Sequence, residues 1–431
     1  MSSLTSPGES LARVLGAAEN SSPAKAVEAV TRELKSALGA AAVSFLIADF
    51  SGRGLVRLES SARDDTSPDP SDRPARATRT ILPFDGGPAE RAVRTQTVQV
   101  VAPRNQVSGD TPMDGRWLVL APVTERGEAI GLLEMYLPTV PDRTVLAAIA
   151  QVAHVLAFVV IANGRHTDVF ELEQRQVAFS LPAEIQRRLL PDSFTCEASA
   201  FTLAGWLEPA ANIGGDTFDY SLGNNDLHLS VTDAMGHGVT SALIATLCVG
   251  SLRNTRRQRL GLLGQAAEAN AALHGHARTL NEGFASGLLG RVDLRTGVIT
   301  LVNGGHVPPL LLRAGVVRIV EVPVDLPFGM FAETRYRTTE FTLVKGDRLV
   351  FITDGMVERA ASNLDLITAI KETSDLHPRE ATRALADSAV KVSGGELADD
   401  ATLMLLDWHG DHSMERATDA GADLEASNVR N

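Results

Sequence analysis

Residues 227–249 read LHLSVTDAMGHGVTSALIATLCV. Apolar and polar residues alternate up to Val231, which predicts a strand, and the apolar run from Val239 to Val249 predicts a helix. Asp233 and a glycine-rich turn lie between the two. An aspartate at a strand end, followed by such a turn, can present its carboxylate and a backbone carbonyl together. This stretch therefore predicts a strand–turn–helix unit with a candidate cation ligand where the strand ends.

Other acidic residues also stand where predicted strands begin or end: Asp216 and Asp219 after Gly214-Gly215, Asp354 in Thr353-Asp354-Gly355, and the pair Asp399-Asp400. A single Asp-Gly pair is more often a turn than a ligand. Four such sites spread across one domain are harder to attribute to turns. They predict oxygen ligation of hard cations such as Mg²⁺ or Mn²⁺, not thiolate or imidazole chemistry.

The second half of the chain carries an ordered set of short motifs: Ile185-Gln186 to Leu189-Leu190-Pro191, Gly-Gly-Asp at 214–216, Asp-Ala-Met-Gly-His-Gly from 233, Asn-Gly-Gly-His from 303, Leu-Pro-Phe-Gly from 326, Thr-Asp-Gly from 353 with Glu358, and Asp-Asp-Ala-Thr from 399. Over about residues 183–407 this order resembles the bacterial branch of the metal-dependent type 2C (PPM-type) protein serine/threonine phosphatases. That branch is typified by the stage II sporulation protein E and sigma-factor-B regulator phosphatases.

The resemblance implies an α-β-β-α sandwich whose edge binds two divalent cations, Mn²⁺ or Mg²⁺. It implies that Asp216 and Asp233 hold the metal pair, with Asp233 bridging and the Ala234 carbonyl completing one coordination shell. Asp354 and Asp399 would hold the other ion, although Asp399 and Asp400 are nearly interchangeable in sequence. Asp219 remains open between a group that supports the ligands and a turn former.

Two histidines lie within these motifs: His237 in the turn after Asp233, and His306 after Asn303-Gly304-Gly305. Each is either a general acid or a hydrogen-bonded residue that fixes its loop, and we favour the second role. The implied activity is hydrolysis of phosphoserine or phosphothreonine, in this branch on a phosphorylated anti-sigma-factor antagonist, so that sigma-factor-dependent transcription is controlled. Two alternatives are a catalytically silent, ligand-binding dimeric sensor and a phosphatase for small phosphate esters.

The first half predicts an α+β unit: a helix over Lys25–Leu38, strands at Ala42–Asp49, Gly54–Ser60 and Thr97–Val101, a short helix near Pro88–Arg94, a hairpin of Trp117–Val123 with Ala129–Tyr136, and a long helix from Asp142. This order resembles the GAF family of small-molecule sensor domains, with a ligand pocket on one side of the sheet. The sequence does not identify a ligand, and a domain that only dimerises is the alternative.

We expect an N-terminal segment at 1–19, the GAF-like domain at 20–163, a linker or signalling helix at 164–191, the phosphatase domain at 192–408 and a disordered tail at 409–431. Val145–Ala162 is apolar enough to raise the possibility of a membrane span. However, its apolar residues alternate four and three apart, which favours a buried or dimer-forming helix and a homodimer.

The formal net charge of −13 argues against nucleic acid or anionic membrane as the main partner, because phosphates attract a basic surface. The two cysteines, Cys196 and Cys248, form neither a disulfide framework nor a zinc cluster. The first residues show no pattern of a secretory signal. Together these features predict a cytoplasmic protein.

Overall fold

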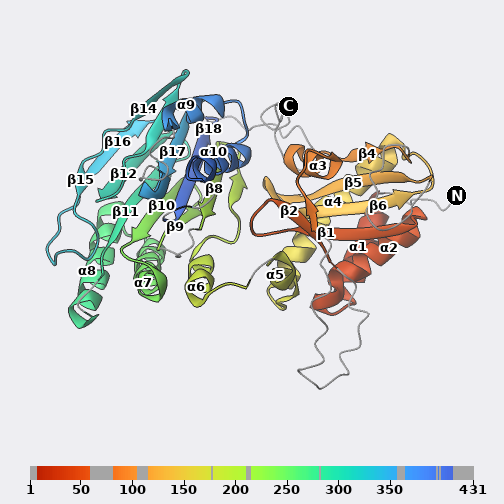
Figure 1. The fold of residues 1–431 in the computed structure, drawn as a ribbon, viewed down its shortest axis with the longest axis horizontal. Coiled ribbons are helices and arrows are strands. Elements are labelled where there is room, and N and C mark those ends of the chain that lie inside the picture. Colours follow the sequence, from red (N-terminus) through yellow and green to blue (C-terminus); the bar gives the residue numbers. More distant parts are fainter. Residues whose placement is uncertain are drawn as a thin grey trace. The chain divides into compact units, whose positions relative to one another are not determined.

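The computed structural model describes residues 7–58, 81–103, 115–175, 178–209, 215–280, 283–356, 365–394, 397 and 399–410. These residues form two compact units, the first ending at Ala178 and the second beginning at Phe179 (Figure 1). The boundary falls within the predicted linker. Gly214, Glu358 and the predicted tail from 411 onward lie outside the described residues.

The first unit is built on an antiparallel sheet in the order β3-β2-β1-β6-β5-β4. Its strands are β1 (Ala42–Ala48), β2 (Gly54–Arg57), β3 (Ile81–Pro83), β4 (Gln99–Val101), β5 (Trp117–Glu125) and β6 (Glu128–Leu137). The predicted hairpin of β5 and β6 is confirmed. Its turn residues, Arg126 and Gly127, have φ values of 43° and 82°, the left-handed conformation that suits a tight hairpin.

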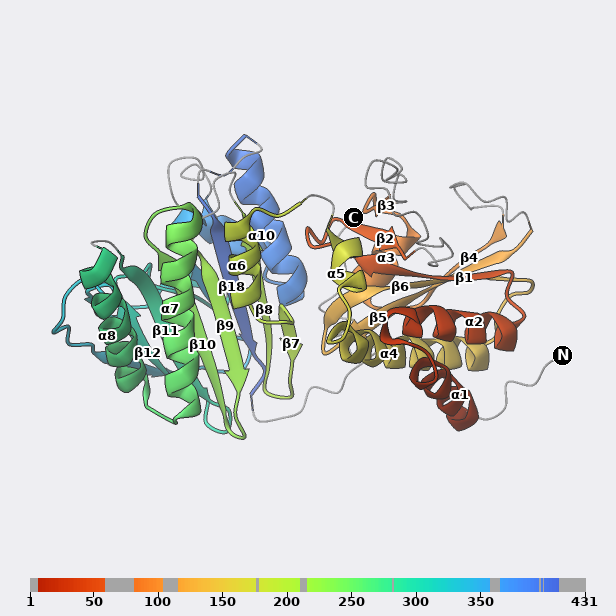
Figure 2. The ribbon, with the colours of Figure 1, turned by 90° about the horizontal axis from the view of Figure 1, so that it is seen from below.

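Helices cover both faces of this sheet. One face packs against α2 (Ala26–Leu38), which follows the 3₁₀ turn η1 (Pro23–Lys25), and α4 (Arg143–Gly164), and α1 (Pro7–Glu19) packs on these two helices (Figure 2). The other face packs against α3 (Pro88–Thr95). Helix α1 occupies most of the segment for which we predicted no element. Val14 and Ala18, four residues apart, are buried against α2 and α4, so this helix is held by packing.

Helix α4 is long and apolar enough, by length and composition alone, to cross a membrane. In this structure the predicted stripe of apolar residues is intramolecular, because Ile149, Val152, Leu156 and Val159 are buried in the core of the first unit. Phe158 and Ile161 lie on the exposed side of the helix. The four-and-three spacing therefore marks the face that packs on the sheet.

The predicted linker does not form one helix continuous with α4. Helix α5 (Val169–Gln174) packs back on the first unit, where Phe170 is buried and the Gln174 amide donates to the Ala48 carbonyl at 3.0 Å. Helix α6 (Leu181–Leu189) starts at Ser180, whose hydroxyl accepts from the Ala183 amide, with Pro182 in its first turn. Since α6 belongs to the second unit, the segment is divided between the two units.

The second unit is a sandwich of two six-stranded sheets. One has the order β15-β12-β11-β10-β9, with β16 also paired to β12, and the other has the order β14-β13-β17-β18-β8-β7. The strands are β7 (Thr195–Glu197), β8 (Phe201–Glu208), β9 (Thr217–Leu222), β10 (Asp226–Ala234), β11 (Ala285–Asp293), β12 (Val298–Gly304), β13 (Leu310–Arg313), β14 (Val316–Ile319), β15 (Val324–Asp325), β16 (Thr338–Thr342), β17 (Arg348–Ile352) and β18 (Ala401–Trp408).

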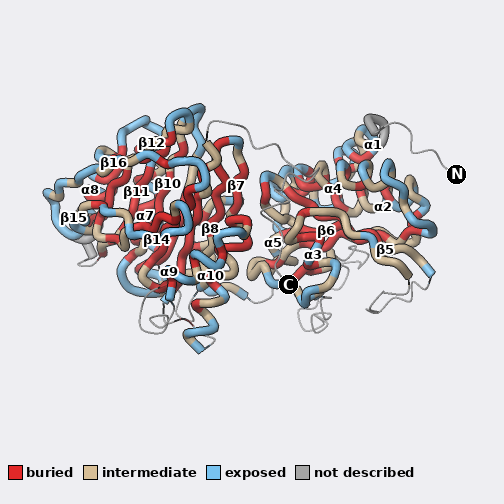
Figure 3. Tube along the Cα trace, turned by 90° about the horizontal axis from the view of Figure 1, so that it is seen from above, coloured by how far each residue is buried: buried red, intermediate tan, exposed pale blue. Residues whose placement is uncertain are grey.

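Apolar side chains from both sheets, such as Phe201, Phe218 and Phe351, fill the space between them, each contributing about 1.5–3 kcal/mol by burial. Helices α7 (Gly238–Arg257) and α8 (Leu262–Leu280) cover the outer face of the β9–β12 sheet, with α6 beside α7 (Figure 2). Helices α9 (Leu366–Glu372) and α10 (Pro378–Val392) cover the outer face of the other sheet. Figure 3 shows the buried residues running along the strands of both units. The predicted α-β-β-α sandwich is confirmed.

Candidate metal centre

The predicted aspartates gather at one edge of the sandwich because strand pairing brings their segments to the same place. In the first sheet, Thr217 of β9 pairs with Thr232 of β10, so Asp216 and Asp233 are neighbours across the two strands. In the second sheet, Ile352 of β17 pairs with Leu403 of β18. This pairing places Asp354, just after β17, near Asp399 and Asp400, just before β18.

Asp216 connects the two sheets. Its carboxylate accepts a hydrogen bond of 2.6 Å from the Thr353 hydroxyl, and the same hydroxyl accepts from the Thr402 amide at 2.9 Å. Burial raises the pKa of Asp216 well above its usual range, and the charges of Asp233 and Asp400 raise it further, while the threonine hydrogen bonds oppose this shift. Asp216 is therefore a buried carboxyl group held close to other acids.

Asp233 lies at the centre of the acidic group. Its pKa is raised to about 7, first by burial and then by the charges of Asp354, Asp399 and Asp400. All the predicted carboxylates thus act on one another electrostatically, directly or through Asp233. Such a group is stabilised by bound cations, which remove the mutual repulsion and compensate for lost hydration.

Two glycines permit the close approach of the chain segments around these acids. A Cβ atom on Gly215 would lie 2.7 Å from the Ala234 carbonyl oxygen, and one on Gly355 would lie 2.0 Å from the Asp400 carbonyl oxygen. Any side chain at either position would push the segments apart. The glycines next to Asp216 and Asp354 in the sequence are thus explained by packing at the site.

The structure distinguishes Asp399 from Asp400. Asp399 is exposed, whereas Asp400 is buried and its carboxylate accepts a 2.6 Å hydrogen bond from the Gln186 amide of α6. The Asp400 backbone amide donates to the Asp399 carboxylate at 2.8 Å. Gln186 lies in the motif from Ile185 to Pro191, which by itself predicts no role for it. A polar residue on the buried side of an amphipathic helix is the signal that was available.

Asp219 has a structural role. Its carboxylate accepts from Arg253 at 2.9 and 3.1 Å and from Arg256 at 3.0 Å, and these ion pairs attach α7 to β9. Arg253 also donates to the Leu189 carbonyl at the end of α6, at 2.6 Å. Asp219 is buried within strand β9, so it is not a turn former. Its carboxylate contacts arginines of α7, so it does not support the proposed ligands directly either.

The two histidines occupy different surroundings. His306 is buried, its ring lies 2.7 Å from the Ser286 hydroxyl, and its backbone is bonded in both directions to the Asn303 side chain. Burial lowers the pKa of His306 to about 4, so the ring is neutral near pH 7 and suits the loop-fixing role. His237 is exposed at the start of α7.

The donor set fits hard divalent cations, because it consists of aspartate carboxylates with the Ala234 backbone carbonyl beside them. Within the described ranges, no group of three His, Cys, Asp or Glu side chains is close enough together to hold an ion. The structure therefore shows the carboxylates as electrostatic neighbours, not as a finished coordination sphere.

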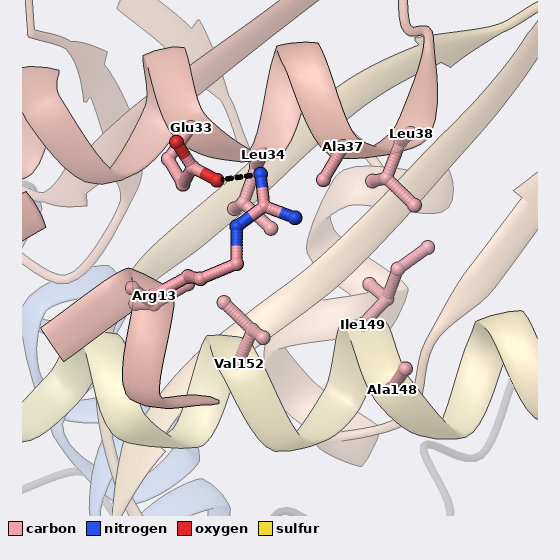
Figure 4. A pocket seen from close by; sticks show the side chains of 9 residues that line it. Arg13, Glu33, Leu34, Ala37, Leu38, Ala148, Ile149 and Val152 are labelled. Atoms are coloured by element: carbon pink, nitrogen blue, oxygen red, sulfur yellow. Dashed lines mark ion pairs between the residues drawn. The ribbon is translucent and has the colours of Figure 1, made fainter. Parts of the chain in front are cut away.

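A separate pocket lies in the first unit, among α1, α2 and α4, and is lined by Arg13, Val14, Glu33, Leu34, Ala37, Leu38, Ala148, Ile149 and Val152 (Figure 4). Arg13 and Glu33 form an ion pair across it. This pocket lies between helices, whereas the resemblance to sensor domains implies a pocket that faces one side of the sheet.

Comparison with known proteins gives a family match in the second half of the chain and several similar relatives. Residues 223–409 match the family described as Stage II sporulation protein E (SpoIIE). Phosphoserine phosphatase RsbP of Bacillus subtilis (strain 168) is 22% identical over 184 residues, which are 42% of this chain and 46% of that protein. Phosphoserine phosphatase RsbU of the same organism is 23% identical over 238 residues, 52% of this chain and 68% of that protein.

Similar solved structures include the RsbU and RsbW domains of Rv1364c from Mycobacterium tuberculosis, with a TM-score of 0.43 and 25% identity over 49% of this chain and 61% of that one. The phosphatase domain of SpoIIE from Bacillus subtilis, with a fragment of its regulatory domain, has a TM-score of 0.43 and 20% identity over 50% of this chain and 66% of that one. This chain spans about half the length of RsbP, the first of the relatives described above.

Proposed function

We propose that this chain is a metal-dependent protein serine/threonine phosphatase, because residues 223–409 match the family described as Stage II sporulation protein E (SpoIIE). The observation that carries the proposal is the convergence of Asp216, Asp233, Asp354 and Asp399 at one edge of the sandwich. There burial and then the charges of Asp354 and Asp399 raise the pKa of Asp233, and burial and then the charge of Asp233 raise the pKa of Asp216. Relatives that are named phosphoserine phosphatases support the choice of reaction.

Two divalent cations at this edge, Mn²⁺ or Mg²⁺, would supply an activated water and neutralise charge on the phosphate. Asp216 and Asp233 would hold the pair, with Asp233 between the ions and the Ala234 carbonyl beside it. Asp354 and Asp399 would hold the second ion. Asp399 is preferred to Asp400 because it is exposed, whereas Asp400 is buried and bonded to Gln186.

Other residues of the site hold the side chains of Asp216 and His306 in position. Thr353 fixes the Asp216 carboxylate by its 2.6 Å hydrogen bond, and Ser286 and Asn303 hold the neutral His306 in place. The Cys248 thiol is buried and its pKa is raised to about 12, so it is not a nucleophile. The chain's own contribution is therefore a rigid, acidic edge that gathers cations next to the phosphate ester.

The substrate we propose is a phosphorylated anti-sigma-factor antagonist, as the resemblance to sigma-factor-B regulator phosphatases implies, so that the output is sigma-factor-dependent transcription. The first unit would act as a GAF-like regulatory domain in a cytoplasmic homodimer. The exposed Phe158 and Ile161 of α4 offer a face for a second copy. If so, Phe158→Glu should convert the dimer to a monomer in light scattering.

The decisive experiment measures phosphate release from a phosphoserine protein and from p-nitrophenyl phosphate, with Mn²⁺ and after EDTA. Metal-dependent release from the protein supports the proposal. Release from the small ester alone favours a phosphatase for small esters, and Mn²⁺ binding or dimerisation without any release favours a silent sensor.

A further inference from the structure

Helix α6 reaches the metal centre through one side chain, Gln186. The side chain is buried, with 4% of the residue exposed. Its Nε2 atom donates to the backbone carbonyl of Asp216 at 2.9 Å and to the carboxylate of Asp400 at 2.6 Å. The carbonyl and an ionised carboxylate are both acceptors, so the amide nitrogen is the atom that must face them, and both of its hydrogens are used.

We propose that Gln186 is a positioning residue of the metal centre. Its amide joins the segment that enters β9, which carries Asp216, to the segment that enters β18, which carries Asp399 and Asp400. These segments belong to different sheets, so the amide sets how far apart the two groups of ligands stand. The inference rests on the proposed function in one respect, which is that cations occupy these aspartates.

The effect passes from Gln186 to the ligands through short connections. Asp400 is held at its carboxylate by Gln186, and its backbone amide donates to the Asp399 carboxylate at 2.8 Å. The Asp400 carbonyl faces Gly355, the residue after Asp354. An orientation imposed on Asp400 is therefore shared by the two proposed ligands next to it.

The position of α6 is fixed independently of Gln186. Arg253 of α7 donates to the Leu189 carbonyl and pairs with Asp219 of β9. The end of α6 is therefore attached, through Arg253, to the β9–β12 sheet of the second unit. For packing alone, an apolar side chain would serve at position 186, because burying an amide without partners costs about 1–3 kcal/mol. Hydrogen bonds to groups around a ligand set, in contrast, hold its geometry.

The test compares Mn²⁺ affinity, measured by isothermal titration calorimetry on the full chain, among the wild type, Gln186→Met and Arg188→Gln. Methionine keeps the unbranched shape and removes both donors. Arg188 is the matched control, because it lies on the exposed side of the same helix with 59% of its side chain accessible. We expect Gln186→Met to weaken Mn²⁺ binding about 10- to 100-fold and Arg188→Gln to leave it unchanged.

A double-mutant cycle with Asp400→Asn separates positioning from general loosening. If Gln186 acts through Asp400, the double variant binds Mn²⁺ no more weakly than Asp400→Asn alone. Additive losses would overturn the proposed route, and wild-type affinity of a folded Gln186→Met protein would overturn the proposal itself. If Gln186→Met is unfolded by circular dichroism, Gln186→Asn, which withdraws the amide by one methylene, is measured against the same two outcomes.

The phosphatase assay stays separate from this titration. A wild-type protein that binds Mn²⁺ but hydrolyses no phosphate ester contradicts the proposed function and leaves the role of Gln186 to be decided by affinity. A wild type that hydrolyses phosphoprotein, with a Gln186→Met variant of equal Mn²⁺ affinity, contradicts only the positioning role.

Discussion

Buried acidic side chains occur in both units, but their partners differ. In the first unit Glu134 is paired with Arg57 and Glu90 with Arg94, both at 2.6 Å. At the edge of the second unit, the charges that act on Asp233 are those of other aspartates. The same unit also contains paired acids, such as Asp219 with Arg253 and Arg256. The partner of a buried acid therefore separates acids that are paired with arginine and stabilise the fold from acids that neighbour one another, which we propose to bind cations.

The largest effect is expected from Asp233→Asn. The variant should lose metal-dependent phosphatase activity by orders of magnitude, because the carboxylate proposed to lie between the two ions is gone. Its fold should persist, and metal-free protein should melt higher than the wild type, since one of several repelling charges is removed. Activity assays and circular dichroism check both parts. Retained activity would contradict the bridging role.

Asp219→Asn tests the acids that are paired with arginines. Removing a buried carboxylate that pairs with two arginines should cost about 3 kcal/mol of unfolding free energy. Mn²⁺ affinity and activity per folded molecule should fall far less than in Asp233→Asn, because Asp219 contacts α7 and is linked to α6 only through Arg253. Urea denaturation and calorimetry provide the measurements. A loss of Mn²⁺ affinity with unchanged stability would show that the assignment is wrong.

The family resemblance implied the sandwich, and sequence patterns predicted acidic residues at the strand ends because strand ends, turn glycines and acidic residues are local features. They did not distinguish Asp399 from Asp400, since that difference depends on Gln186, 214 positions away in the sequence. They did not decide the role of Asp219, because its partners Arg253 and Arg256 lie on α7, 34 and 37 positions away in the sequence. The heptad-like spacing in α4 predicted that this side of the helix is buried, but not whether the sheet of the same unit or a second copy of the chain covers it.

The pH dependence of stability should also distinguish the acids. The pKa of Asp233 is about 7 in the folded protein and about 3.8 when unperturbed, so the folded state holds this proton more tightly. Stability of the metal-free protein attributable to Asp233 is therefore present below about pH 4 and lost as the pH rises to 7. The buried His306 has the opposite sign but is common to the wild type and to Asp233→Asn, so it cancels in their difference.

We accordingly expect the stability advantage of Asp233→Asn over the wild type to grow between about pH 4 and 7, by about 3–4 kcal/mol. Saturating Mn²⁺ should remove this advantage, because the ion binds the ionised form. Urea denaturation at several pH values, with and without Mn²⁺, measures the difference. An advantage that does not depend on pH would mean that Asp233 is not titrating in this range.

The smallest effects are expected in the first unit, where the acids are paired and differ in burial. Arg57→Gln should cost about 1–2 kcal/mol, because Glu134 has only 8% of its side chain exposed. Arg13→Gln should cost less than about 1 kcal/mol, because 51% of the Arg13 side chain is exposed and water screens its ion pair with Glu33. Neither variant should change Mn²⁺ affinity. If Arg13→Gln were as costly as Arg57→Gln, then burial of the acid would not be what determines the strength of these pairs, and the contrast between the two units would rest on the identity of the partner alone.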